Sequence, residues 1–100
     1  MDIDQFVNSL HEKAIPPAIL LLPQKDLLCA LWYEAKGNWE QAHLIAQTKE
    51  TPLYCLVHAY LHRQEGDTWN AGYWYRRAGR AIPTISLAEE WRQIAEELLA

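Results

Sequence analysis

Hydrophobic residues recur along the chain at the three- and four-residue spacing of amphipathic helices. The spacing is clearest near the two ends, over residues 3–10 and 87–98, where apolar positions are separated by polar ones. No segment shows the strict alternation of apolar and polar residues that is typical of a half-buried strand. The pattern therefore predicts an all-α protein.

Residues that begin and end helices divide this pattern into six expected helices. Gly37 and Gly66 each follow a helical stretch, as C-terminal capping glycines do, and Pro52 is placed to begin a helix. Asp67 is expected to cap the next helix, and Ser86 starts a capping-box pattern before the last one. The expected helices span residues 3–13, 23–36, 38–50, 52–65, 67–79 and 87–99.

Short connections between these helices favour antiparallel neighbours within one domain over residues 1–100. The expected parts are an N-terminal helix with a proline-rich connector (1–23), a first hairpin (24–50), a second hairpin (51–80) and a C-terminal helix (84–100). Helical hairpins leave apolar faces open at the ends of a stack. We therefore expect the two terminal helices to cap those faces.

The two predicted hairpins share residues at equivalent positions. These are Leu27, Ala30, Gly37 and Ala42 in the first hairpin and Leu56, Ala59, Gly66 and Ala71 in the second. After its glycine turn, the second hairpin carries a small, aromatic, small and proline series, which is Ala71, Tyr75, Ala78 and Pro83. Residues 24–83 thereby resemble tetratricopeptide repeats, which implies a right-handed array of hairpins that binds a protein or peptide. Residues 56–80 are also similar to a family of small bacterial repeat-like proteins, a resemblance that implies no activity.

The charge balance narrows the possible partners. The formal net charge is −4 at pH 7, which argues against a non-specific binder of nucleic acid or of anionic membranes. A small basic island over residues 63–80 lies between two acidic segments. The apolar stretches are also far shorter than the ~20 residues of a membrane helix. We expect neither nucleic acid nor a membrane among the partners.

Cysteine usage and the first residues predict a cytoplasmic location. The chain begins Met-Asp-Ile-Asp, which is acidic where a secretory signal would be basic. Cys29 and Cys55 form no Cys-x-x-Cys unit and lie in helical patterns, so we interpret them as reduced core cysteines.

No phosphate-binding loop or nucleophile motif is apparent. We therefore assign no cofactor and no catalytic residue, and we expect a protein that is not an enzyme.

His58 and His62 lie one helical turn apart and so share a helix face, opposite the apolar stripe of the same helix. Metalloproteases use this spacing to hold zinc. Possible third ligands are His43, Cys29 and Asp26. Tyr33 and Tyr54 are expected beside the histidines. The favoured interpretation is a pair of helix-packing imidazoles without a metal, and a small-ligand or metal-dependent activity is the alternative.

The basic island also carries alternating aromatic and arginine residues. They are Trp69, Tyr73, Arg76, Arg77 and Arg80. Such combinations are frequent in protein interfaces, and arginine binds carboxylates in a bidentate manner. The alternative is a solvated face whose arginines pair with the glutamate-rich segment 89–97.

The aromatic composition is unusual, with 5 Trp and 5 Tyr against 1 Phe. Six of these residues are assigned to packing: Trp32, Trp39, Tyr60, Trp74, Tyr75 and Trp91. The other four are candidates for a surface site: Tyr33, Tyr54, Trp69 and Tyr73.

We expect a helical module that binds a protein or peptide, with a homodimer as one possible state. A ligand- or metal-dependent activity and a structural role in an assembly are the alternatives.

Overall fold

The computed structural model describes all residues 1–100, and it contains helices but no strand. The α-helices are α1 (Ile3–Asn8), α2 (Lys25–Ala35), α3 (Trp39–Ala46), α4 (Pro52–Gln64), α5 (Thr68–Ala78) and α6 (Leu87–Leu99). Two short 3₁₀ helices, η1 (Ser9–His11) and η2 (Pro17–Leu21), lie between α1 and α2. The predicted all-α class with six helices is confirmed.

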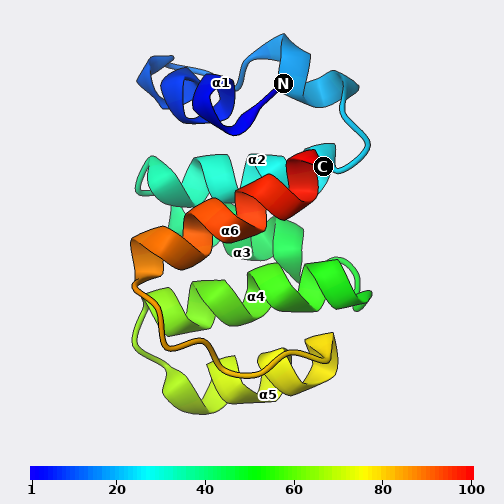
Figure 1. The fold of residues 1–100 in the computed structure, drawn as a ribbon, viewed down its shortest axis with the longest axis vertical. Helices are drawn as coiled ribbons and strands as arrows, with labels where there is room; N and C mark the ends of the chain where they lie inside the picture. The colour runs from blue at the N-terminus through cyan, green and yellow to red at the C-terminus, as the bar shows by residue number, and fades with distance from the viewer.

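Helices α2 to α5 follow one another along the long axis of the molecule (Figure 1). The α2–α3 and α4–α5 pairs have the most extensive helix contacts, and α3 also packs on α4. Helix α6 returns across α2 and α4 and contacts α1, where Phe6 stacks on Trp91 with ring centroids 5.6 Å apart. The N-terminal segment therefore covers the α2 end of the stack, through η2 on α2 and α1 on α6, whereas α6 lies along the side of the hairpins and does not cover the outer face of α5.

Both hairpins turn through the same backbone geometry. Gly37 and Gly66 have φ angles of 86° and 87°, a left-handed conformation that glycine adopts without a Cβ clash. The next residues, Asn38 and Asp67, donate their N–H groups to the carbonyl five residues earlier at 2.8 and 2.9 Å. These bonds close a Schellman motif at the end of α2 and of α4. Each residue then caps the following helix through its side chain.

Several helices are shorter than the pattern predicted. Helix α2 begins at Lys25 rather than Pro23, α3 ends at Ala46, and a 3₁₀ turn replaces the end of the predicted first helix. Beyond α3, the Thr48 hydroxyl donates to the Ile45 carbonyl at 2.7 Å. Such side-chain bonds compete with the backbone bonds that would extend a helix.

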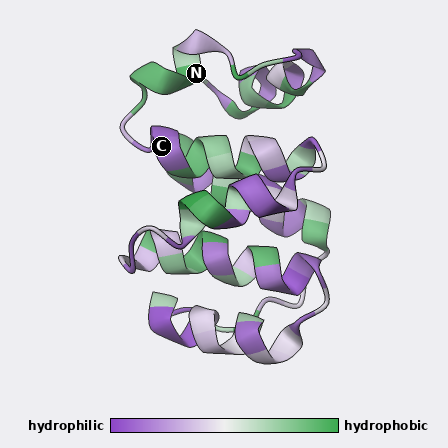
Figure 2. Cartoon of the chain, turned by 180° about the vertical axis from the view of Figure 1, so that it is seen from behind, coloured by the Kyte–Doolittle hydropathy of each residue, from purple (hydrophilic) through white to green (hydrophobic).

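Helix α4 lies at the centre of the molecule. Every residue from Tyr54 to Leu61 is buried, because α2, α3, α5 and α6 all pack on this helix. All the helices, α4 included, carry both hydrophobic and hydrophilic residues (Figure 2). Cys29 and Cys55 are buried and unpaired. None of the helices combines the length and apolar character that a membrane span requires.

Candidate metal centre

Three imidazole rings meet where α3 packs against α4. His43 comes from α3, and His58 and His62 come from successive turns of α4. One nitrogen from each ring lies within 4.8 Å of the other two. The Nε2 atoms of His43 and His58 are 3.0 Å apart, and the His58 and His62 rings stack with centroids 4.9 Å apart. These three residues are called the histidine cluster below.

Two tryptophans hold the rings of the histidine cluster in place. Trp39 lies one helical turn before His43 on α3 and stacks on it, with ring centroids 4.8 Å apart and an interplanar angle of 11°. Trp74 of α5 stacks on His58 at 4.0 Å and 17°. The indole N–H of Trp39 donates to the Leu61 carbonyl at 2.8 Å, which fixes that ring in turn. The imidazoles are therefore oriented by packing.

The environment of the histidine cluster favours neutral imidazoles. His58 is only 6% exposed, and burial, together with the charges of His43 and His62, lowers the pKa of His58 to about 4. Burial and the charge of His62 also lower the pKa of His43, although Glu65 opposes this. Neutral imidazole is the form that binds metal ions. Protons therefore compete weakly for His43 and His58 at neutral pH.

His62 has a carboxylate partner on the side away from its free nitrogen. Its Nδ1 lies 2.7 Å from Oε1 of Glu65, the C-cap residue that follows α4. In neutral His62, Nδ1 carries the hydrogen and donates it to Glu65, so Nε2 keeps its lone pair for an ion. Metal-binding histidines commonly have such a carboxylate partner, which orients the ring and raises its basicity.

The spacing of the histidine cluster suits a small divalent ion. Zinc binds histidine at roughly 2.0–2.1 Å, which places the nitrogens of a tetrahedral site about 3.3 Å apart. The 3.0 Å between the Nε2 atoms of His43 and His58 is close to that value. The outer limit of 4.8 Å for the three nitrogens requires only a modest closing movement.

The structure shows what surrounds the α4 histidines. We interpreted His58 and His62 as helix-packing imidazoles on the face opposite the apolar stripe of α4, and His58 is buried there because α3 and α5 both pack on that side of α4. Of the three proposed third ligands, His43 joins the cluster, whereas Cys29 and Asp26 do not. The spacing rule predicted that His58 and His62 share a face, which the stacked rings confirm.

Tyr33 and Tyr54 are not brought to the histidine cluster. Tyr33 packs edge-on against Trp32. Tyr54 is 8% exposed, and its hydroxyl donates to Asp26 at 3.4 Å. Burial and the negative charge of Asp26 raise the pKa of Tyr54.

The outer face of α5 exposes large apolar side chains. Trp69 is 76% exposed, Tyr73 is 37% exposed, and Ile82 of the following segment is 58% exposed. Arg77 donates to the Tyr73 hydroxyl at 3.1 Å and lies over the rings of Tyr73 and Trp74. Because Trp74 also stacks on His58, this face adjoins the histidine cluster.

The three arginines of this region differ in their pairing. Arg77 pairs with Glu50 at 3.4 Å, and Arg80 pairs with Glu97 at 2.5 Å. Arg76 is exposed and forms no ion pair. The glutamate-rich C-terminal segment therefore supplies a partner to one of the three arginines and leaves Arg76 free.

Sequence reasoning missed Trp39 and Trp74, which it assigned to packing alone. The spacing of Trp39 and His43, one helical turn apart, was a signal that the two rings would meet. No comparable signal linked Trp74 to His58, because they lie on different helices. Their contact depends on how α4 packs against α5.

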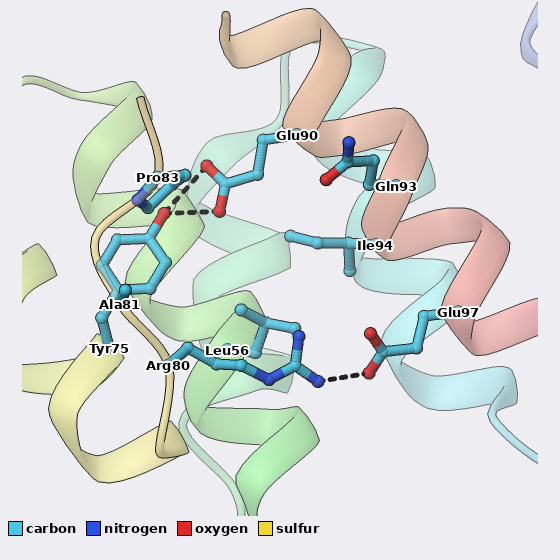
Figure 3. A pocket seen from close by; sticks show the side chains of 9 residues that line it. All are labelled: Leu56, Tyr75, Arg80, Ala81, Pro83, Glu90, Gln93, Ile94 and Glu97. Carbon is cyan, nitrogen blue, oxygen red and sulfur yellow. Dashed lines mark hydrogen bonds and ion pairs between the residues drawn. The ribbon is translucent and has the colours of Figure 1, made fainter. Parts of the chain in front are cut away.

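A separate cavity of about 210 Å³ lies between α6, α5 and the segment that joins them (Figure 3). Its two carboxylates already have partners in the protein. Glu90 accepts hydrogen bonds from Tyr75, and Glu97 pairs with Arg80. The cavity therefore offers no unpaired charge to a ligand, and the histidine cluster is the stronger candidate site.

Comparisons with protein-family models, with curated proteins and with solved structures found no match to this chain.

Proposed function

We propose that this protein binds one first-row transition-metal ion, of the class represented by Zn²⁺, through His43, His58 and His62. The proposal is carried by the convergence of one nitrogen from each ring within 4.8 Å. Imidazole ligands suit zinc, copper, nickel and iron, whereas magnesium and calcium favour oxygen ligands. A set of three histidines therefore indicates the former group.

Three further observations support the metal site. The stacked tryptophans reduce the side-chain freedom that binding would otherwise have to restrict. The lowered pKa values of His43 and His58 favour the ligating form. Glu65 lies 2.7 Å from Nδ1 of His62, the kind of carboxylate partner that orients a metal-binding histidine.

A chelator competition titration with Zn²⁺ tests this proposal. We expect one ion per chain, and we expect His43→Ala and His62→Ala to weaken binding by more than the 10–100-fold that loss of an outer partner typically costs. His11→Ala is the matched control, because His11 is exposed on η1 and outside the cluster. Wild-type protein that binds no Zn²⁺, or equal weakening in all three variants, would contradict the proposal.

A second proposed function is the binding of an acidic protein or peptide at the outer face of α5, which also includes Arg80. The large exposed surface of Trp69 favours it, because tryptophan and arginine dominate binding energy at interfaces. The unpaired Arg76 adds a positive charge that a carboxylate can neutralise.

We further infer a reducing, cytoplasmic location, because both cysteines are free thiols.

Replacing Trp69 with alanine tests the α5 face. Because Trp69 is 76% exposed, we expect unfolding free energy to change by no more than about 0.5 kcal/mol, while the partner is lost. Affinity capture and light scattering of both proteins check this. Loss of a dimer in the variant would identify a second copy as the partner, and loss of a larger complex would indicate an assembly. Unchanged capture and mass would contradict the proposal.

A further inference from the structure

We infer that an ion in the histidine cluster keeps a fourth coordination position that no residue of this chain fills, and that an exchangeable water, hydroxide or small anion occupies it. This inference rests on the metal binding proposed above. Structural zinc sites are usually closed by four protein ligands, whereas three protein ligands plus a solvent molecule are typical of reactive sites. The histidine cluster therefore belongs with the reactive sites, in which three protein ligands leave one coordination position to solvent.

The nearest carboxylates are already engaged in other contacts. Glu65 lies 2.7 Å from Nδ1 of His62. The two nitrogens of an imidazole ring point in diverging directions, so an ion on Nε2 of His62 lies away from Glu65. Asp67 accepts hydrogen bonds from the backbone and side-chain nitrogens of Asn70 at 3.1 and 2.6 Å. These bonds cap α5 and keep Asp67 at the turn.

No other histidine, cysteine, aspartate or glutamate joins the three imidazoles. The group whose ligand atoms lie within 4.8 Å contains His43, His58 and His62 alone. A four-coordinate ion held by these nitrogens therefore takes its remaining ligand from outside the chain. His62 itself belongs to a second group with Glu65 and Asp67, which places two negative charges beside the cluster without adding a fourth ligand to it.

Two of the three rings of the histidine cluster are partly exposed to solvent. Trp39 and Trp74 lie nearly flat against two of the rings and close those sides, but an indole N–H can only donate a hydrogen bond and cannot ligate. His43 is partly exposed, and the His62 side chain is 12% exposed. Parts of His43 and His62 are therefore open to solvent, whereas His58 is buried.

Charge and space define the class of the fourth ligand. Three neutral imidazoles bring no negative charge to the ion, so the ion still attracts a small anion or a water that ionises readily, although Glu65 and Asp67 beside His62 reduce the attraction for an anion. The three cavities of the protein are lined by other residues. The cluster therefore has no enclosed space for a large ligand, and its exchangeable ligand is small.

Cobalt substitution with sodium azide as the probe tests this inference. Co²⁺ replaces Zn²⁺ in such sites, and its visible absorption reports coordination number and ligand type. We expect the 100-residue protein to bind one Co²⁺ with the visible bands of a four-coordinate ion. Added azide should change these bands in a saturable manner, as it enters the fourth position.

The outcomes separate this inference from the function on which it rests. His11→Ala should give the wild-type cobalt spectrum and the same azide response, and His62→Ala should lose the cobalt bands. Stoichiometric Co²⁺ binding with a spectrum that azide leaves unchanged overturns the open position but leaves metal binding standing. A protein that takes up neither Co²⁺ nor Zn²⁺ overturns both.

Discussion

Replacing Glu90 with alanine is expected to lower the free energy of unfolding by about 3–5 kcal/mol, the usual cost of removing one partner from a buried ion pair. Glu90 is 4% exposed on α6. Its carboxylate accepts hydrogen bonds from the Tyr75 hydroxyl at 2.6 and 2.8 Å, as Figure 3 shows, and from Arg63 at 2.8 Å. The substitution leaves the Tyr75 phenol without its acceptor and the Arg63 guanidinium without its carboxylate, so that Arg63 keeps only its bond to the Ile85 carbonyl where α6 meets α4 and α5.

Urea unfolding of the variant measures this loss. Glu96→Ala is the matched control on the same helix, because Glu96 is exposed and pairs only with Arg92 at 3.5 Å. An exposed pair of this kind contributes no more than about 0.5 kcal/mol. If Glu90→Ala does not refold, Glu90→Gln retains one acceptor oxygen and should lose less stability. Similar losses in the Glu90 and Glu96 variants would contradict the buried-pair account.

Acidification from pH 7.5 to pH 4 is expected to cost the metal-free protein about 3 kcal/mol of stability through His58 alone, because each unit of pKa shift corresponds to roughly 1.4 kcal/mol. The pKa of His58 falls from 6.5 to about 4 on folding, through burial and the facing charges of His43 and His62. The unfolded chain therefore binds the proton first as the pH falls. The stabilisation is complete above pH 6.5 and is lost progressively toward pH 4.

Urea unfolding at several pH values, in the presence of a chelator, checks this dependence. His58→Phe retains an aromatic ring against Trp74 but cannot take up a proton, so its stability should fall less steeply between pH 6.5 and 4. His43 should still contribute in the same direction, because its pKa is also lowered. His11→Ala should keep the wild-type slope. A wild-type slope in His58→Phe would contradict the assignment to His58.

The helices could be predicted because their ends are determined locally. Gly37 and Gly66 adopt the positive φ angles that their places after a helix suggested, and Ser86 forms its capping box with Glu89. The surroundings of α4 could not be predicted in the same way. Hydrophobic periodicity shows which residues share a face, but it does not show how many helices will pack on that face. His58 is buried for this reason.

The histidine cluster could be predicted only in part. The helical spacing places His58 and His62 together, since that relation lies within α4. His43 was one of three candidates, because its approach depends on the packing of α3 against α4. The pairing of Arg63 with Glu90 likewise depends on where the segment after α5 places α6 against α4. Contacts between helices thus set the limit of what sequence pattern can predict.

X-ray absorption spectroscopy at the zinc edge of the zinc-loaded protein decides whether the histidine cluster binds the ion. We expect three imidazole nitrogens from His43, His58 and His62 at about 2.0–2.1 Å, together with one light-atom ligand that no residue supplies. The multiple scattering of imidazole rings distinguishes these ligands from water or carboxylate. A zinc ion bound by fewer than three imidazoles, or by a shell of six oxygens, would contradict the account.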